Sequence, residues 1–547
     1  MACKGIRRWP GGVAFMYITL LERADGMRRN KEFEPKKIIN AVFSQKFIVI
    51  SLLLLQIAFL IFAVVSLAGQ FVFVYYFFIA VELIAVMYII NSGENPAYKL
   101  AWILPILIFP IFGAFAFIYL KFQSSYRYEK NLSIKKIENT KPYLKQKASV
   151  IKALEQKSSG VSNLAHYMRV YGGYPIYQNT DVTYFRLGEE KFRAMVRELE
   201  KAKHFIFMEY FIIDKGYMWD TIHEILVRKA KQGVEIRLLY DGMGTQSELP
   251  YRYDKKLRAE GIDCKVFNPF VPLVTTIQNN RDHRKILVID GHTGFTGGVN
   301  IADEYINRKE RFGHWKDTAV MLRGEAVWNL TMMFFQLWEI TGEQSSAEYD
   351  NYRPSSFKKL DIDDDSFVLP FSDSPLDDEN VGELLYMNII NNARDYVYIT
   401  TPYLIPDNEM MTALCYAAKS GVDVRIIVPG IPDKWYIRLI GQSFYKELIA
   451  KGVKIYEYSK GFIHAKNFLS DDSKAVVGTI NLDYRSLYLH FECAAFMYGC
   501  ECIADIKDDF EDMFENHCRR VTYEECASRP IAQRMLSAVL GLFAPLL

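Results

Sequence analysis

One short pattern occurs twice in this chain, and this repetition constrains the fold more than any other feature. The stretch DHRKILVID begins at Asp282 and the stretch IHAKNFLSD begins at Ile463. Aligned on their histidines, both read His-x-Lys-x-x-x-x-Asp, with His283, Lys285 and Asp290 in the first copy and His464, Lys466 and Asp471 in the second. Polar groups inside apolar sequence are costly without a task, so we interpret the repeat as a duplicated site.

The sequence before each motif repeats as well. A β-rich run, a helical pattern and a second β-rich run lead to the first motif, at 202–214 and 233–242, and again to the second, at 393–406 and 421–430. Strands alternating with helices predict a mixed or mainly parallel sheet covered by helices. We therefore expect an α/β fold of two duplicated α/β/α sandwich halves that share one active site, with the acidic stretch Asp361–Ser366 as a linker.

Strand geometry separates the roles of the repeated residues. Residues i and i+2 of a strand point to the same face, so each histidine lies beside its lysine. The aspartate, seven positions after the histidine, has the opposite parity. We keep Asp290 and Asp471 in the candidate catalytic set as members of the motif, although this parity favours a role in anchoring the strand end.

Each motif is followed by further matching residues. Small residues and an asparagine, Asn300 or Asn481, come next and suit binding of a substrate. Farther on, Asp317 and Glu492 each precede an apolar strand. A catalytic imidazole needs a carboxylate that fixes its tautomer and stabilises its charged form, and we predict this task for Asp317 and Glu492.

Two histidines and two lysines around a pseudo-twofold axis suit an anionic phosphodiester. The lysines neutralise the non-bridging oxygens, one imidazole attacks phosphorus, and the other protonates the departing oxygen. No cluster of carboxylates near either motif resembles a magnesium site, so we expect neither a metal nor another cofactor. Eight cysteines without CxxC spacing predict free thiols rather than a zinc site or a disulfide framework.

The N-terminal part of the chain carries three long apolar runs, Phe47–Leu67, Phe71–Ile90 and Ala101–Leu120. Runs of this length predict membrane insertion. Both flanks are basic, and the positive-inside rule then requires an even number of crossings. Either the third run, which contains Pro105 and Pro110, enters without crossing, or one basic flank lies outside.

These patterns give the expected domain boundaries. We expect a basic extension at 1–46, a membrane segment of two to three helices at 47–120, a basic linker at 121–170, a first half at 171–355 and a second half at 356–547. Glu22, Arg23 and Asp25 stand where a signal peptide would need small residues, so we interpret the extension as uncleaved, with Met27 as an alternative start. The final segment, Arg529–Leu547, predicts an amphipathic helix that lies on a membrane surface or packs onto the second half.

The motifs resemble those of a known family. The stretches NNRDHRKILVIDG, TGGVNIADEY, TTPYLIPD and GTINLDYRS are similar to signatures of the phospholipase D superfamily, and most closely of bacterial cardiolipin synthases. The resemblance runs from ENPAYKLAWILPILIFPIFG to the C-terminus. It implies a multi-pass protein of the bacterial plasma membrane that joins two phosphatidylglycerols into cardiolipin and glycerol through a phosphohistidine. By this resemblance His283 is the nucleophile and His464 the general acid.

Two departures from the family and two alternative readings accompany this expectation. Asp282 and His490 stand where the family more often has asparagine, which bears on fine substrate preference. A membrane-anchored phosphodiesterase that hydrolyses phospholipid or nucleic acid would use the same chemistry with water. The net charge of +2 gives no indication of a nucleic-acid partner. We expect phosphatidylglycerol and anionic membrane lipid as partners. A non-catalytic scaffold is disfavoured because both motifs are complete.

Overall fold

The computed structural model describes Ser51, Ala58 and residues 72–121, 124–270, 276–342, 348–357, 359–362, 365–377 and 379–546. The chain divides into two compact units, Met1–Ile61 and Phe62–Leu547. Apart from Ser51 and Ala58, the described residues belong to the second unit. The first predicted apolar run, Phe47–Leu67, lies outside the described residues except for these two positions.

The first half is built on a seven-stranded mixed sheet. Its order is β1-β9-β7-β6-β2-β3-β4. The strands are β1 (Thr180–Phe185), β2 (Phe205–Tyr210), β3 (Glu235–Asp241), β4 (Asp263–Phe267), β6 (Lys285–Ile289), β7 (Thr293–Gly297) and β9 (Ala319–Gly324). Strands β2, β3 and β4 run parallel, whereas β6, β7 and β9 pair antiparallel.

The second half repeats this sheet strand for strand. Its order is β10-β17-β16-β15-β11-β12-β13, followed by the added edge strand β18. The strands are β10 (Phe367–Asp373), β11 (Tyr396–Thr400), β12 (Asp423–Pro429), β13 (Lys454–Tyr458), β15 (Asn467–Ser470), β16 (Lys474–Gly478), β17 (His490–Tyr498) and β18 (Cys518–Arg520). The same order and the same parallel trio, β11, β12 and β13, confirm the predicted α/β fold with duplicated halves.

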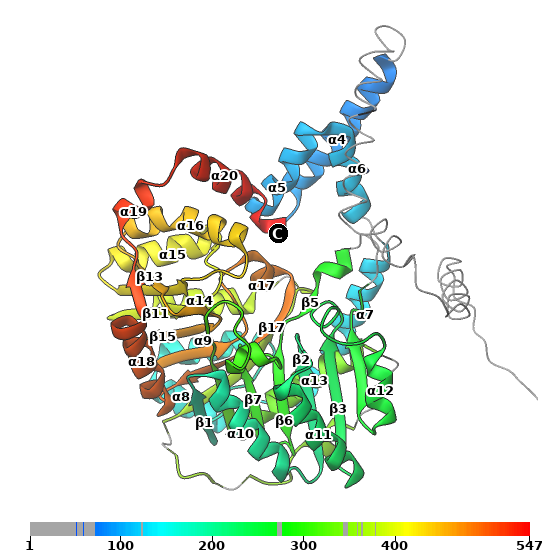
Figure 1. Ribbon diagram of the computed structural model, residues 1–547, viewed down its shortest axis with the longest axis vertical. Helices are drawn as coiled ribbons and strands as arrows, with labels where there is room; N and C mark the ends of the chain where they lie inside the picture. The colour runs from blue at the N-terminus through cyan, green and yellow to red at the C-terminus, as the bar shows by residue number, and fades with distance from the viewer. Residues whose placement is uncertain are drawn as a thin grey trace, which may run out of the picture. The chain divides into compact units, whose positions relative to one another are not determined.

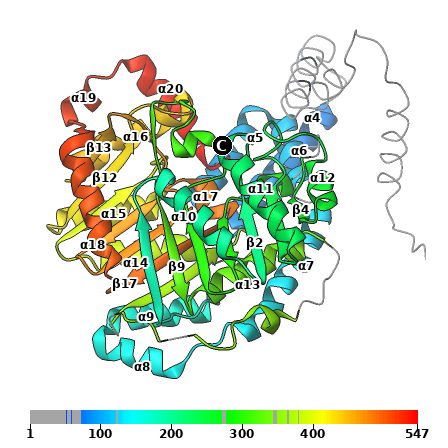
Figure 2. The same ribbon diagram turned by 60° about the horizontal axis from the view of Figure 1, so that its bottom comes forward.

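Helices cover the faces of both sheets (Figures 1 and 2). In the first half α10 (Gly188–Lys201), α11 (Tyr217–Lys231) and α12 (Tyr253–Ala259) pack on one face, and α13 (Val327–Ile340) packs on the other. Nearly all of α13 is buried, including its polar side chains Asn329, Thr331, Gln336 and Glu339. It contacts β2, β6 and β9 as well as β10, so it joins the two halves through a common core.

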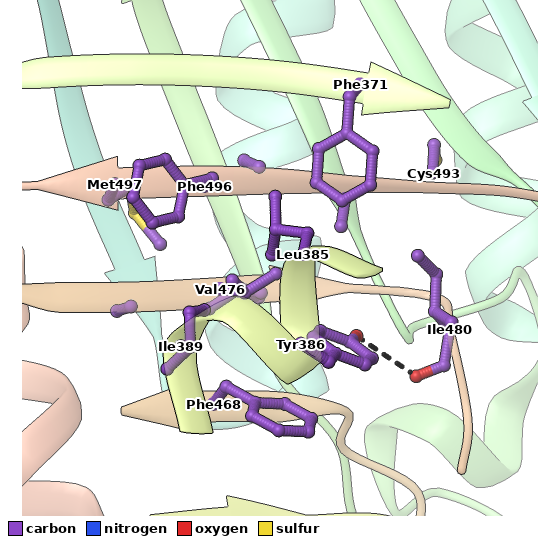
Figure 3. Close-up of a cluster of buried hydrophobic side chains, with 14 of the residues drawn as sticks. Phe371, Leu385, Tyr386, Ile389, Phe468, Val476, Ile480, Cys493, Phe496 and Met497 are labelled. Atoms are coloured by element: carbon purple, nitrogen blue, oxygen red, sulfur yellow. Dashed lines mark hydrogen bonds between the residues drawn. The ribbon is translucent and has the colours of Figure 1, made fainter. Parts of the chain in front are cut away.

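The second half shows how its helices seal the sheet (Figure 3). Helix α14 (Val381–Asn391) lays Leu385, Tyr386 and Ile389 on β15, β16 and β17. The ring of Tyr386 stacks on that of Phe468 at 3.9 Å between centroids, and its hydroxyl donates to the Ile480 carbonyl at 3.2 Å. Helices α15 (Asn408–Lys419), α16 (Trp435–Ala450), α17 (Tyr484–Tyr488) and α18 (Cys502–Asp512) complete this half.

Two short parallel strand pairings connect the halves. Strand β5 (Arg281–Asp282) pairs with the start of β17, and β14 (Gly461–Ile463) pairs with β8 (His314–Lys316). Each pairing therefore joins the strand before one repeated motif to a strand of the other half. Figure 1 shows β17 beside β5. These two links fix where His283 and His464 lie, because each histidine directly follows one of the paired strands.

The N-terminal helices of the described chain are α4 (Val72–Asn91), α5 (Pro96–Ile108) and α6 (Pro110–Lys121). The third predicted apolar run is thus divided between α5 and α6, with the break at Phe109. Among the helices that the structure describes, none is both long enough and apolar enough to cross a membrane. The membrane crossings stay a prediction.

The segment that we expected to be a basic linker is mostly helical. It contains α7 (Ser124–Thr140), α8 (Ala148–Lys157) and α9 (Ser159–Val170), with the short η1 (Lys141–Tyr143) between them. Leu154, Leu164 and Met168 from α8 and α9 are buried in the common core. The segment therefore packs against the catalytic halves as well as connecting them to the N-terminal helices.

The chain ends in α19 (Tyr523–Ala527), α20 (Ile531–Leu542) and η6 (Ala544–Leu546). One side of α20 packs against α16, and η6 contacts α5. The other side of α20 exposes Ile531, Met535 and Val539. The remaining short elements are η2 (Thr276–Asn279), η3 (Asp303–Ile306), η4 (Tyr349–Tyr352) and η5 (Met513–His517).

Candidate active site

The first histidine of the repeat is held by a carboxylate of the other half. The backbone N–H of His283 donates to the Phe491 carbonyl at 2.9 Å, as the β5–β17 pairing continues past Asp282. This register brings the His283 Nδ1 within 2.9 Å of both carboxylate oxygens of Glu492. A carboxylate accepts and cannot donate, so Nδ1 carries the proton and the Nε2 lone pair is left for chemistry.

The second histidine is held in the mirrored way. The His464 N–H donates to the Lys316 carbonyl at 2.7 Å, where β14 runs beside β8. Its Nδ1 lies 2.7 Å from Asp317 Oδ2, in the first half. Each half therefore supplies one imidazole and the carboxylate that orients the imidazole of the other half. The sequence predicted the four residues but not this exchange between the halves.

The two carboxylates are supported differently. Glu492 accepts from the Ser486 hydroxyl at 2.8 Å and from the Thr479 hydroxyl, whereas Asp317 accepts from the Thr318 N–H at 2.8 Å. Gly298 is the counterpart of Thr479, and a Cβ there would lie 2.0 Å from the Asp317 carboxylate. Glycine is required at this position because any side chain would collide with that carboxylate.

Charge and burial set the protonation of the imidazoles. Burial lowers the pKa of His283 to about 3, although the Glu492 carboxylate opposes the shift. Burial and the neighbouring Lys466 lower the pKa of His464 to about 4, against the effect of Asp317. Burial also acts on Glu492, but the neighbouring His283, which donates to the carboxylate, and the charge of His490 outweigh it and hold the pKa of Glu492 well below the usual range. Before an anion binds, both imidazoles are therefore neutral at neutral pH.

Two buried lysines lie beside the imidazoles. The Lys285 ammonium donates to the His283 carbonyl, and the Lys466 ammonium donates to the His464 carbonyl and lies 2.8 Å from the His464 Nδ1. Burial lowers the pKa of Lys285 to about 8 and that of Lys466 to about 7, while Glu492 and Asp317 act in the opposite direction. An anion that binds between these lysines would stabilise their charged forms.

The repeated residues form one site rather than two. The charge of Lys285 acts on both His283 and His464. Hydrogen bonds also cross between the halves around the site, from the Thr318 hydroxyl to Asn467 at 2.8 Å and between Thr296 Oγ1 and Cys493 Sγ at 3.3 Å. Imidazoles, ammonium groups and carboxylates of both halves therefore act on one another within a shared, buried centre.

The motif aspartates lie elsewhere. Asp290 follows β6 at the end away from His283 and accepts from the backbone N–H groups of Lys203, His204 and Phe205, all at 2.8 Å. Asp471 follows β15 and accepts from the N–H groups of Arg394, Asp395 and Tyr396, at 2.9–3.1 Å. Both have φ of 50°, in the left-handed region of a tight turn. They close the strand ends and are remote from the imidazoles.

The two asparagines are buried and engaged with the protein to different degrees. Asn300 accepts from the Ile212 N–H at 3.1 Å and donates to the Tyr305 hydroxyl at 2.7 Å, so both ends of its amide have partners. Asn481 donates to Ser486 at 2.9 Å, but within the described ranges its buried Oδ1 has no hydrogen-bond partner. Of the two, Asn481 has the amide atom left to contact a ligand.

Two groups near the site, Lys191 and His490, were not among the predicted site residues, and His490 was noted only as a departure from the family. Lys191 is fully buried, donates to the Val299 carbonyl at 2.9 Å, and has its pKa lowered to about 7 by burial, against the charge of Asp317. His490 lies beside His283, with 5.7 Å between ring centroids. The available signal for His490 was its position two residues before Glu492, on the same face of the strand.

Comparison with protein families gives two matches. Residues 195–327 and 386–514 match the family described as "Cardiolipin synthase, PLD-like domain", and residues 82–120 match the family described as "Phospholipase_D-nuclease N-terminal". The two segments of the first match each contain one histidine, lysine and aspartate set. The family assignment therefore covers both halves of the site.

Individual relatives extend over most of the chain. The chain is 49% identical over 463 residues to an uncharacterized protein of Streptococcus mutans serotype c, covering 85% of this chain and 99% of the relative. It is 36% identical over 484 residues to a cardiolipin synthase of Geobacillus sp. strain WCH70, covering 86% and 93%. The crystal structure of phosphatidylserine synthase from Haemophilus influenzae Rd KW20 superposes on this chain with a TM-score of 0.53 at 15% identity. The superposition covers 67% of this chain and 95% of that one. This likeness concerns the fold alone.

Proposed function

The chain belongs to the phospholipase D-like cardiolipin synthase family, and from this premise we propose that it transfers a phosphatidyl group between two phosphatidylglycerol molecules, giving cardiolipin and glycerol. The observation that carries the proposal is the crossed pairing of His283 with Glu492 and of His464 with Asp317. Transfer through a phosphohistidine needs one imidazole as nucleophile and a second as proton carrier, and the crossed pairing supports both roles.

In the first step we assign the attack to His283. Its Nε2 forms a bond to phosphorus while the bond from phosphorus to the glycerol headgroup oxygen breaks. His464, protonated when the anionic substrate is bound, gives its proton to that oxygen, and glycerol leaves. Glu492 stabilises the positive charge that develops on the His283 ring, because its carboxylate is held against Nδ1.

In the second step the headgroup hydroxyl of another phosphatidylglycerol takes the place of glycerol. His464, now neutral, removes the proton from this hydroxyl, and the oxygen attacks phosphorus as the phosphorus–nitrogen bond to His283 breaks. Cardiolipin is released and both imidazoles return to their starting states. Water in the same place would give phosphatidic acid, so the choice between transfer and hydrolysis depends on which acceptor reaches the intermediate.

We assign the other candidate residues by their contacts. Lys285 and Lys466 neutralise the non-bridging phosphate oxygens, and Asn481 is the asparagine that we place nearest to substrate contact. Asn300 orders the surrounding loops through Ile212 and Tyr305. Asp290 and Asp471, which the motif placed in the catalytic set, act instead as anchors of the strand ends. The halves 171–355 and 356–547 remain our proposed domain boundaries.

We further propose that the protein works at the cell membrane. Large apolar side chains are exposed on α4, α5 and α6, among them Phe73 at 84% and Ile84 at 69%. Exposed apolar surface of this kind suits contact with lipid. The apolar side of α20 offers a second such surface in the same unit. We propose that residues 47–120 insert into this membrane and cross it more than once, and that anionic lipids are partners of the protein.

The test is a product analysis with purified full-length protein in detergent micelles. Phosphatidylglycerol labelled in its acyl chains is incubated with the protein, and cardiolipin is resolved from phosphatidic acid. Cardiolipin with an equal amount of free glycerol is the expected outcome. Phosphatidic acid as the main product would replace transfer by hydrolysis, and unchanged lipid would contradict both.

A further inference from the structure

The nucleophile is part of a cluster with one member, His490, that the transfer reaction does not use. One nitrogen each of His283 and His490 and one carboxylate oxygen of Glu492 lie within 4.8 Å of one another. Within the part of the chain that the structure describes, this is the one such group of three potential metal ligands. Glu492 and His490 are two positions apart on β17, and His283 is brought to them by the β5–β17 pairing.

His490 provides a second, independent observation. Both nitrogens of its ring are buried, and neither has a hydrogen-bond partner among the residues that the structure describes. Its Nδ1 is 3.8 Å from Glu492 Oε1, which is too long for a hydrogen bond. Buried imidazole nitrogens are seldom left without partners. A ligand that binds nitrogen lone pairs would satisfy a ring for which the described part of the chain offers no partner.

The donor set identifies the class of ligand. Two imidazoles and one carboxylate, with a further position open to water, form a set that Zn²⁺ accepts. Imidazole also suits Co²⁺, Ni²⁺ and Cu²⁺, whereas Mg²⁺ and Ca²⁺ prefer oxygen ligands. We propose that His283, His490 and Glu492 form a binding site for Zn²⁺ and related divalent transition ions, and that occupation of this site inhibits the enzyme reversibly.

The ion inhibits the enzyme whichever nitrogen of His283 it binds. At Nε2 the ion takes the lone pair that attacks phosphorus. At Nδ1 it takes the place of the proton that Glu492 accepts. The neutral ring then carries its proton on Nε2, which leaves no lone pair there for attack on phosphorus. The metal site and the phosphohistidine therefore exclude each other. The ion is no part of the transfer reaction, which proceeds when the site is empty.

The binding test uses metal-stripped full-length protein in detergent, with Co²⁺ as the probe, because Co²⁺ bound by histidine gives visible absorption bands. We expect one tightly bound equivalent per chain in the wild type and loss of these bands in His490→Asn. The matched control is His204→Asn, which removes an exposed histidine outside the cluster. Equal bands in His490→Asn and the wild type would overturn the site. This readout is independent of catalysis, so it stands even if cardiolipin is not the product.

The inhibition test adds Zn²⁺ to the phosphatidylglycerol assay. We expect Zn²⁺ to inhibit the wild type and His204→Asn alike, EDTA to restore both, and His490→Asn to need at least about tenfold more Zn²⁺. Loss of an outer partner of a metal ligand already costs about 10–100-fold in affinity, and loss of a ligand should cost no less. Equal Zn²⁺ sensitivity of His490→Asn and the wild type would refute inhibition through this cluster.

Discussion

Replacing Glu492 by glutamine tests the crossed pairing most sharply. The substitution preserves the shape of the side chain but removes the charge that faces the His283 Nδ1 at 2.9 Å through both oxygens. The Ser486 and Thr479 hydroxyls, which also donate to this carboxylate, would meet an amide instead. A hydrogen bond to a charged group contributes about 1.5–3 kcal/mol, so phosphatidyl-enzyme formation should slow by about 10-fold to about 150-fold.

The assay compares two substrates that differ in their leaving group. With phosphatidylglycerol, Glu492→Gln and Asp317→Asn should both be slow. With a phosphatidyl ester of nitrophenol, whose leaving group needs no proton, Asp317→Asn should recover most of its first-step rate, because only the proton transfer from His464 is impaired. Glu492→Gln should not recover, because attack by His283 is still required. A Glu492→Gln rate within about threefold of wild type, or the opposite pattern of recovery, would refute the crossed assignment.

Three further predictions concern other parts of the molecule. Asp290→Ala should lower the melting temperature, because three backbone N–H groups lose their acceptor, at a cost of about 1–3 kcal/mol for each that becomes buried and unpaired. The kcat of the folded fraction should stay near wild type. A large loss of kcat without a change in melting temperature would return Asp290 to the catalytic set. The KM for phosphatidylglycerol should rise as pH increases above about 7, the pKa of Lys466, because anion binding then requires uptake of a proton. Lys466→Arg should flatten this rise. An equal rise in the variant and the wild type would show that Lys466 is not the group that titrates. Serine at Ile531, Met535 and Val539 together should reduce activity on vesicles but not on a soluble short-chain substrate, with Gln533→Ser as control; equal loss on both substrates would make α20 part of the core only.

The duplicated architecture could be predicted from the sequence because both halves carry the same local signals. Alternating apolar strands and helices recur in the same order before each motif, and the structure repeats the same strand order in both sheets. Strand parity also separated His283 and Lys285 from Asp290, which closes the far end of β6. These inferences depend on neighbouring residues, where periodicity is informative.

The contacts between the halves could not be predicted in this way. The pairing of β5 with β17 and of β14 with β8 joins segments far apart in the chain, and no local pattern specifies which carboxylate meets which histidine. The helices at 124–170 could not be predicted from the sequence for a related reason. Their basic composition suggested a connection, whereas their apolar positions are buried by packing against distant elements such as α13 and α14.

The central claim is that His283 carries the phosphatidyl group and His464 moves the proton. Mass spectrometry of the His464→Ala protein, quenched under non-acidic conditions after incubation with phosphatidylglycerol, tests this directly. The account predicts a phosphatidyl adduct on the peptide that contains His283, no turnover to cardiolipin, and no adduct on His464 in the reciprocal His283→Ala protein. An adduct on His464 in the His283→Ala protein would reverse the roles. Turnover above about a tenth of the wild-type rate in either variant, a barrier increase of only about 1.4 kcal/mol, would contradict the shared site.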